Sequence, residues 1–406
     1  MSEQSEVEKK LIQYFRDGEK IASKEFEIGI ELEHFIVEKE SKEAVSYYGE
    51  AGVENILKRL QEIYHAEAIC VKEHLIGLQT EEFILTLEPA AQLEISINPQ
   101  ISIKRVEEIY KEFREKLQNI LDIYGYDALQ YGYQPKSQVK NLELLPKERY
   151  QMMDRYFAEI GLYGRQMMRG TASTQVCIDF TSEEDFKKKY VLAYQLAPIM
   201  MFLFDNSPFY EGKQNTIPML RNRIWNGVDE KRVNVWKQMD FLNVSYDRYA
   251  AFVANTPIIV HETKKDVSYS CKNARECYIM PSESEVEHIL SMVFPMVRLK
   301  QFIEIRYADA MELEQALFYI TWIKGLFIGV DEVERYFKAL DSASVSKMQE
   351  AFKELIEKRE NAIVYGKKLN QIVIELYEIG KKYISKEEKC YLSMKYMPEN
   401  MKRICK

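Results

Sequence analysis

The sequence predicts an α+β fold with a largely antiparallel sheet, followed by a helical C-terminal part. Strand-like segments are frequent in the first half, they do not alternate regularly with helices, and the last quarter is helical almost throughout. A doubly wound parallel sheet requires regular alternation of strands and helices, so this pattern disfavours it. No linker rich in Pro, Gly or Ser divides the chain, so residues 1–406 are expected to form a single domain, with a helical elaboration over about 340–406.

The strand predictions are based on period-two alternation of apolar side chains. Residues 26–37 (FEIGIELEHFIV) alternate in this way. Residues 68–73, 82–88 and 91–97 are further candidates, and the tight turn Pro89-Ala90-Ala91 joins the last two. Residues 173–180 (STQVCIDF) and 300–307 (KQFIEIRY) complete the set.

The helix predictions are based on apolar residues at helical spacing. Such residues recur from Ile103 to Tyr124, and residues 183–205 form a long apolar segment that Pro198 is expected to break. Residues 344–360 and 366–386 are helical in the C-terminal part.

Composition excludes several functional classes. The formal net charge is −8 and no basic stripe is present, so no nucleic-acid partner is expected. The N-terminus lacks the apolar stretch of a signal peptide, and no run of about 18 apolar residues occurs, so we expect a cytoplasmic protein without a membrane span. The six cysteines are scattered without a CxxC pair, which favours free thiols over disulfides or zinc.

Common catalytic signatures are missing from the sequence. There is no GxxxxGK[ST], GxGxxG, HExxH or GxSxG. Any nucleotide would therefore be bound without a P-loop.

Carboxylates instead gather on one face of several predicted strands. Successive strand residues point to opposite faces, and the residues that share a polar face are Glu27, Glu31 and Glu33, then Gln92, Glu94 and Ser96 with Glu88 before the turn, and Glu304 with Arg306. Each strand alone is also typical of a half-buried sheet with one solvated face. The first two faces carry acids without lysine, however, and such repulsion is relieved by a divalent cation. Oxygen ligands without His or Cys favour magnesium or manganese.

A second group of candidates is cationic. Arg221 and Arg223 precede Trp225 in MLRNRIWNG, and Arg298, Lys300 and Arg306 lie in VRLKQFIEIR. Each could be an ordinary surface charge. Beside an acidic metal face they fit an anionic amino acid and a nucleotide triphosphate, because arginine pairs with carboxylates and phosphates through two parallel hydrogen bonds.

Six segments in order resemble the glutamate–cysteine ligase family of plants and many bacteria, over about residues 26–310. They are EIGIELEHF, LTLEPAAQLEIS, YQPK with LPKERYQMM, MMRGTASTQVCIDF with LAYQLAPIMMFLFDNSPFYEGK, MLRNRIW, and FPMVRLKQFIEIRYADA. The resemblance implies a glutamine synthetase-like fold, in which an antiparallel sheet curls into a funnel with helices packed outside it and substrates bind its concave face.

The resemblance also implies roles for individual residues. Metal-binding roles fall on Glu31, Glu33, Glu88, Glu94 and Glu304, with Glu31, Glu94 and Arg306 acting in catalysis. Substrate-binding roles fall on Arg221, which would grip the glutamate α-carboxylate, and on Trp225, Gln92, Thr171, Ser173 and, for the cysteine pocket, Tyr249. Arg298, Lys300 and Arg306 would contact ATP.

The implied activity is that of a single-domain ligase that joins glutamate and cysteine, the first step of glutathione biosynthesis. It would use ATP and two or three Mg²⁺ ions and pass through a γ-glutamyl phosphate. Two alternatives remain open: a ligase that uses another amine acceptor, and a non-catalytic relative that binds an amino acid or a nucleotide.

Overall fold

The computed structural model describes residues 4–21, 25–235, 240–263, 266–340, 342 and 344–405. Its main sheet is antiparallel at every recorded pairing, in the order β12-β13-β7-β1-β5-β4-β3-β2, with β6 paired to β1. The sheet is open and does not close into a barrel. Its strands are β1 (Ile28–Glu38), β2 (Glu67–Val71), β3 (His74–Gln79), β4 (Phe83–Leu87), β5 (Leu93–Gln100), β6 (Tyr126–Leu129), β7 (Ser173–Ile178), β12 (Val297–Leu299) and β13 (Ile303–Asp309).

Helices are distributed along the whole chain. In the first part they are α1 (Glu6–Asp17), α2 (Val53–Tyr64), α3 (Ile103–Tyr124), α4 (Glu148–Glu159), α5 (Gly164–Gly170), α6 (Glu183–Leu203), α7 (Leu220–Asn226), α8 (Glu230–Val233), α10 (Tyr246–Asn255), α11 (Ala274–Cys277) and α12 (Glu283–Leu290). Towards the C-terminus they are α13 (Leu313–Ile328), α14 (Val330–Ala339), α15 (Val345–Lys358), α16 (Leu369–Lys382) and α17 (Glu399–Ile404). Short 3-10 turns and small hairpins connect them, including η3 (Arg359–Asn361), η4 (Glu388–Leu392), β8–β9 (Phe209–Tyr210 and Lys213–Gln214), β10–β11 (Val260–Glu262 and Val267–Tyr269) and β14–β15 (Ile363–Val364 and Lys367–Lys368).

The alternation seen in the sequence gives the sheet its two faces. Apolar residues of the central strands, such as Ile30, Leu32 and Ile95, are buried in the main core. Helices α3, α6 and α13 contact this sheet, so its apolar surface is removed from water. The other face carries the acids and arginines predicted from the sequence.

The predicted break at Pro198 is wrong. Helix α6 continues through Pro198 to Leu203. Proline lacks an N–H and usually kinks or ends a helix, but all residues from Leu192 to Leu203 are buried. Packing on every side therefore holds the helix together.

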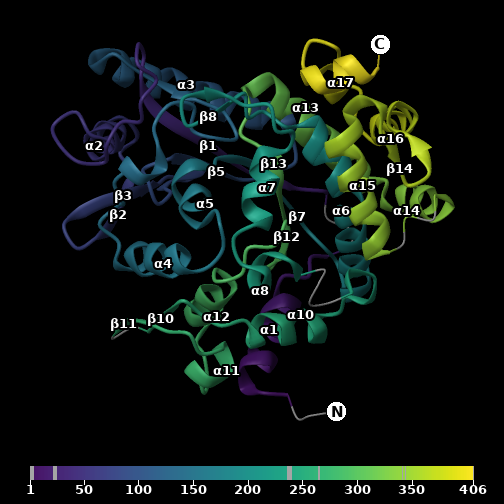
Figure 1. The fold of residues 1–406 in the computed structure, drawn as a ribbon, viewed down its shortest axis with the longest axis horizontal. Coiled ribbons are helices and arrows are strands. Elements are labelled where there is room, and N and C mark those ends of the chain that lie inside the picture. Colours follow the sequence, from purple (N-terminus) through teal and green to yellow (C-terminus); the bar gives the residue numbers. More distant parts are fainter. Residues whose placement is uncertain are drawn as a thin grey trace.

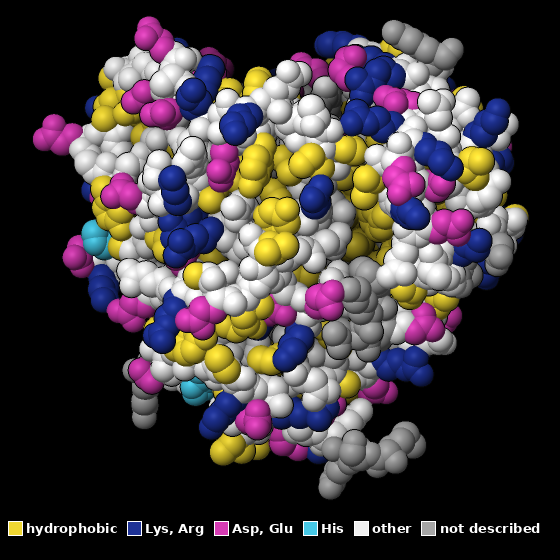
Figure 2. Space-filling model, in the orientation of Figure 1, with side chains coloured by type: hydrophobic (Ala, Val, Ile, Leu, Met, Phe, Trp, Pro, Cys, Tyr) yellow, Lys and Arg dark blue, Asp and Glu magenta, His cyan; other side chains and the backbone are white. Residues whose placement is uncertain are grey.

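Segments distant in sequence meet in the folded chain (Figure 1). The N-terminal helix α1 lies beside α10, and α14 to α17 gather at one side of the molecule. On the face shown in Figure 2, acidic and basic side chains are interspersed. In the part of the chain that the structure describes, no helix is both long and apolar enough to cross a bilayer.

Candidate active site

The polar face of the sheet forms the floor of a cavity of about 260 Å³. It joins side chains from the sheet with others from α4, α5 and α7. The lining residues are Glu31, Glu33, Glu88, Pro89, Gln92, Glu94, Arg149, Tyr150, Met153, Met167, Met168, Thr171, Ser173, Gln175, Arg221, Trp225, Ser291, Phe294, Arg298, Lys300, Glu304 and Arg306. All but one of the site residues predicted from the sequence are therefore brought together here.

The acids lie at the centre of the sheet. On the neighbouring strands β1 and β5, Glu33 lies directly opposite Glu94 and Glu31 opposite Ser96. Directly opposite residues on antiparallel strands have Cβ atoms only about 5 Å apart. Glu88 joins them from the end of the β4–β5 turn, where the N–H of Glu88 donates to the Gln92 carbonyl over 2.9 Å.

Burial and mutual repulsion make these carboxyl groups hard to ionise. Burial raises the pKa of Glu31 to about 8, and the charges of Glu94 and Glu304 add to the effect. Burial also raises the pKa of Glu94 to about 8 and of Glu88 to about 7, with neighbouring glutamates contributing to both. The pKa of Glu33 is raised by burial too, although Ser173 and Gln175 donate hydrogen bonds to its carboxylate. Such a group of carboxyls would gain from a cation in the cavity.

Cations lie at the neighbouring end of the sheet, on β12 and β13. Glu304 on β13 pairs with three of them: with Arg298 (Nε to Oε2 2.7 Å), Lys300 (Nζ to Oε1 2.9 Å) and Arg306 (Nη1 to Oε2 2.9 Å). These charges hold the pKa of the Glu304 carboxyl well below its usual range. The cavity thus has a basic side, formed by β12 and β13, and an acidic side, formed by β1 and β5, with β7 between them.

Two of the predicted roles fall on residues that are paired with each other in this structure, and both roles stay predictions. Glu304 was predicted to bind a metal, but it is fully buried and already neutralised by three cations. Arg298 was predicted to contact ATP, but its Nε and Nη2 both donate to Glu304, and its Nη1 donates to the Val293 carbonyl. Both residues line the cavity, where their ion pair holds β12 against β13.

Arg221 and Trp225 reach the cavity from α7. Arg221 is buried, its Nη1 donates to the Arg306 carbonyl over 3.0 Å, and its guanidinium lies over the Trp225 ring at 5.6 Å. The Arg306 guanidinium lies over the same ring at 5.7 Å. Neither Arg221 Nε nor Trp225 Nε1 has a hydrogen-bond partner among the described residues. Buried donors without partners are costly, so this corner is suited to an anionic ligand.

Gln92, Thr171 and Ser173 line the cavity, but their polar atoms are engaged within the protein. The Gln92 amide accepts from the Ala90 N–H and donates to the carbonyls of Met168 and Thr171. The Thr171 hydroxyl donates to the Met167 carbonyl, and the Ser173 hydroxyl donates to Glu33. These residues hold the walls and the acids in place.

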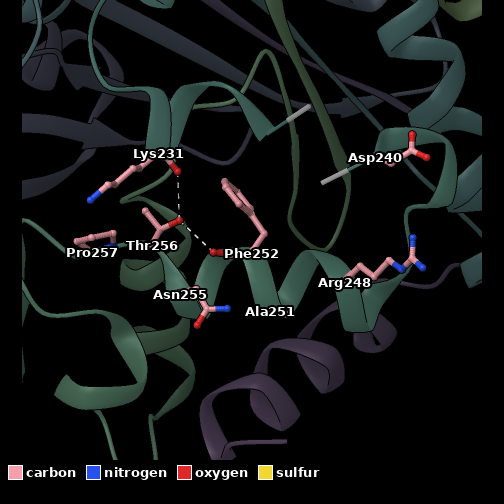
Figure 3. A pocket seen from close by; sticks show the side chains of 8 residues that line it. All are labelled: Lys231, Asp240, Arg248, Ala251, Phe252, Asn255, Thr256 and Pro257. Atoms are coloured by element: carbon pink, nitrogen blue, oxygen red, sulfur yellow. Dashed lines mark hydrogen bonds between the residues drawn. The ribbon is translucent and has the colours of Figure 1, made fainter. Parts of the chain in front are cut away.

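Tyr249, predicted to contribute to a cysteine pocket, does not line this cavity. It is fully buried, and its hydroxyl accepts from the Leu299 N–H over 3.1 Å. Its neighbour Phe252 on α10 faces a different cavity of about 640 Å³ (Figure 3). The two rings lie on the same face of α10, with centroids 5.8 Å apart, but only Phe252 reaches that cavity, because Tyr249 is fully buried.

Several lining residues were not singled out from the sequence. Arg149 enters from α4, and its Nη2 donates to the Ser291 hydroxyl over 2.8 Å. Tyr150 and Phe294 add aromatic walls. The segment LPKERYQMM, which follows the family order, contains both Arg149 and Tyr150 and was the available signal. Phe294 begins the segment FPMVRLKQFIEIRYADA, which also follows the family order, so the same signal was available for it.

The donor set can be tested against the expected divalent cation. Among the described residues, no three His, Cys, Asp or Glu side chains converge tightly enough to enclose a metal ion. The four acids Glu31, Glu33, Glu88 and Glu94 nevertheless share one cavity and offer only hard oxygen donors, which fit Mg²⁺. Glu304 is not part of this set.

Comparisons with known proteins identify relatives of this chain. A family model described as glutamate–cysteine ligase family 2 matches residues 27–377. Over 309 residues the chain is 29% identical to a chloroplastic glutamate–cysteine ligase of Medicago truncatula, covering 74% of this chain and 60% of that protein. The same enzyme of Arabidopsis thaliana is 28% identical, at 74% and 58% coverage. The chain thus spans about 60% of the length of these relatives.

A similar fold occurs in a solved structure. The crystal structure of glutamate–cysteine ligase from Francisella tularensis, in complex with AMP, superposes with a TM-score of 0.54 at 12% identity. The match covers 95% of this chain and 82% of that chain. At this identity the likeness concerns the fold alone, and it supports the predicted glutamine synthetase-like architecture.

Proposed function

Since the chain belongs to the glutamate–cysteine ligase family 2, we propose that it joins the γ-carboxylate of glutamate to the amine of cysteine in an ATP-dependent reaction. The observation that carries the proposal is the cavity itself, in which one buried and three half-buried glutamates face a basic cluster and an arginine with an unpaired N–H. One side suits metal-bound phosphates and the other suits an amino-acid carboxylate.

The chemistry explains why both kinds of charge are needed. A carboxylate does not react with an amine at a useful rate, because its oxygen is a poor leaving group. In the proposed reaction, a γ-carboxylate oxygen of glutamate attacks the γ-phosphorus of ATP, and ADP leaves. The cysteine amine then attacks the resulting acyl phosphate, inorganic phosphate leaves, and the amine proton passes to water. Both steps concentrate negative charge on oxygen, which fixed positive groups stabilise.

The basic and acidic sides of the cavity would bind different groups in this reaction. Arg221, stacked on Trp225, would bind the α-carboxylate of glutamate through its free Nε. Lys300 and Arg306 would meet phosphate oxygens, while Arg298 and Glu304 keep them in place. Glu31, Glu33, Glu88 and Glu94 would hold Mg²⁺. Magnesium, when bound, would neutralise phosphate charge and polarise the γ-phosphoryl group.

The domain organisation, the location and the partners of the chain complete the proposed function. We propose that the chain acts as one catalytic domain in the cytoplasm, with small molecules as its partners. The main hydrophobic core, whose buried residues run from Val7 to Ile404, supports the single domain.

Phosphate release from ATP with Mg²⁺ and glutamate, across a panel of amine acceptors that includes cysteine, tests the proposal. We expect release that depends on glutamate and prefers cysteine, with γ-glutamylcysteine identified by mass. Since Tyr249 lies outside the cavity, acceptor choice needs this direct test. Preference for another amine would retain the ligase chemistry and change the substrate. Lack of release with every acceptor would instead identify a non-catalytic relative.

A further inference from the structure

Two aspartates meet beneath the start of α7, outside the cavity described above. Asp205 follows α6, and Asp309 ends β13. Asp309 is 5% exposed, and Asp205 Oδ1 is buried without a hydrogen-bond donor among the described residues. The two carboxyl groups interact directly with each other. Two adjacent buried carboxylates cannot both be charged at low cost, so a shared proton is the favourable arrangement.

Hydrogen bonding indicates which carboxyl carries the proton. Asp309 Oδ2 accepts from the Asn206 N–H over 2.9 Å and from the Ser207 hydroxyl over 2.6 Å. The Arg221 guanidinium also attracts Asp309. Asp205 has no such cation, and burial together with the charge of Asp309 raises its pKa to about 8. Burial raises the pKa of Asp309 as well, but its hydrogen-bond donors and Arg221 favour the charge of the pair on Asp309 and the proton on Asp205.

The same pair holds the backbone from which Arg221 projects. Met219, the residue before α7, has a φ of +52°. This left-handed conformation is strained for a residue with a side chain. The Met219 N–H donates to Asp205 Oδ2 over 2.7 Å, which compensates the strain. Arg221 follows two residues later, with Asp309 acting on its charged group.

We propose that Asp205 and Asp309 act as positioning residues, fixing the first turn of α7 so that the Arg221 guanidinium stays at the cavity wall, where the substrate carboxylate would bind. Asp205 acts through the backbone of Met219, and Asp309 acts through the Arg221 guanidinium. The role in substrate binding rests on the proposed function, whereas the role in ordering α7 does not.

Three variants separate the contribution of Asp205 through the Met219 backbone from that of Asp309 through the Arg221 guanidinium. They are Asp205→Ala, Asp205→Asn and Asp309→Asn. An asparagine at 205 can accept from Met219 and donate to Asp309, as the protonated aspartate does, whereas alanine can do neither. For Asp205→Ala we expect the KM for glutamate to rise about tenfold, equivalent to about 1.4 kcal/mol, with kcat and the KM for ATP little changed. Asp205→Asn should restore the KM, and Asp309→Asn should raise it. Asp331→Ala, at an exposed surface pair with Lys188, is the matched control.

Hydrogen exchange of the α7 amides, measured on the same full-length proteins, gives a readout independent of catalysis. Exchange should accelerate in Asp205→Ala and remain as in wild type in Asp205→Asn. If wild type releases no phosphate with glutamate, the proposed function fails while exchange still decides this inference. Unchanged exchange and unchanged glutamate KM in Asp205→Ala would overturn it, as would equal impairment of the two Asp205 variants. If Asp205→Ala does not fold, the KM for glutamate is compared between Asp205→Asn and Asp309→Asn. A KM near that of wild type in Asp205→Asn and a raised KM in Asp309→Asn would support the inference, and equal impairment of the two would overturn it.

Discussion

Glu33 and Glu94 illustrate at the scale of single residues how function opposes stability in this site. They face each other across β1 and β5, although like charges at such positions destabilise a sheet. Glu33 is held by Ser173 and Gln175, and Glu94 by the hydroxyls of Thr86 and Ser96. The surrounding hydrogen bonds therefore maintain acids that a purely structural sheet would not retain.

Replacing Glu94 with glutamine should separate activity from folding. Because the pKa of Glu94 is about 8, the side chain is largely neutral at pH 7 without metal. We therefore expect the free energy of unfolding in magnesium-free buffer to stay within about 0.5 kcal/mol of wild type. The value of kcat should fall at least about 100-fold, because glutamine brings no charge to magnesium. Urea unfolding and phosphate release check the two expectations, with the exposed Glu62→Gln as control. Retained magnesium-dependent turnover would refute the metal-binding role.

The Asp205 carboxyl predicts a specific pH dependence of stability. Its folded pKa of about 8 lies above the unfolded value of about 3.9. Its contribution is therefore full below pH 4 and is lost as pH rises towards 8, because only the native state keeps the proton. The slope is at most about 1.4 kcal/mol per pH unit. Between pH 5 and 8, Asp205→Asn should gain at least about 1 kcal/mol relative to wild type in urea unfolding. An exposed Asp331→Asn variant should show no such trend, and parallel curves for wild type and Asp205→Asn would contradict the assignment.

At the scale of elements, the sequence located long strands and helices better than short ones. The alternation in 26–37 predicted β1 (Ile28–Glu38), and the turn at Pro89-Ala90-Ala91 does join β4 to β5. Strands β3, β6 and β12 were not predicted, because segments of three to six residues contain too few alternations to be distinguished. The predicted break at Pro198 was wrong because burial of α6 outweighed the low helix propensity of proline.

Helix α2 offers a test of a backbone effect confined to one element. Its C-cap, His65, is exposed and has a φ of +51°. Glycine adopts this conformation without steric cost and is the usual residue at such positions. His65→Gly should raise the free energy of unfolding by about 0.5–1 kcal/mol. The matched control is Lys58→Gly within the same helix, which should lower it by about 1 kcal/mol. Thermal or urea unfolding distinguishes the two, and a loss of stability in both variants would contradict this reading of the C-cap.

At the scale of the whole molecule, a buried ion pair ties the C-terminal part to the sheet. Lys324 on α13 donates to both oxygens of Glu388 in η4, over 2.9 and 2.8 Å, and to the Ile101 carbonyl over 2.6 Å. Glu388 in turn accepts from the Ile103 N–H at the start of α3. Nearby, α13 and α16 approach so closely that a Cβ at Gly325 would lie 2.2 Å from the Gly380 carbonyl oxygen. These contacts support our proposal of a single domain.

Breaking that pair should destabilise the entire chain in one step. Lys324→Ala would leave Glu388 buried without its cation, a change that costs about 3–5 kcal/mol. We expect circular dichroism and tryptophan fluorescence to report one coincident transition, shifted to lower denaturant. The surface pair variant Lys188→Ala should change stability by less than about 1 kcal/mol. Two separate transitions would show that residues beyond about 340 form an independent unit.

Local sequence alone determined the strand faces on which Glu31, Glu33, Glu94, Glu304 and Arg306 lie, because side-chain alternation in a strand is a property of the backbone. It also determined the antiparallel class and the helical C-terminal part. The pairing of Glu304 with Arg298, Lys300 and Arg306 is local to the β12–β13 hairpin. Tertiary structure decided that Glu31 and Glu94, on β1 and β5, are buried beside one another without such partners. It likewise buried Tyr249 away from the cavity and brought Asp205 to Asp309, because contacts between residues distant in the chain leave no periodic trace in the sequence.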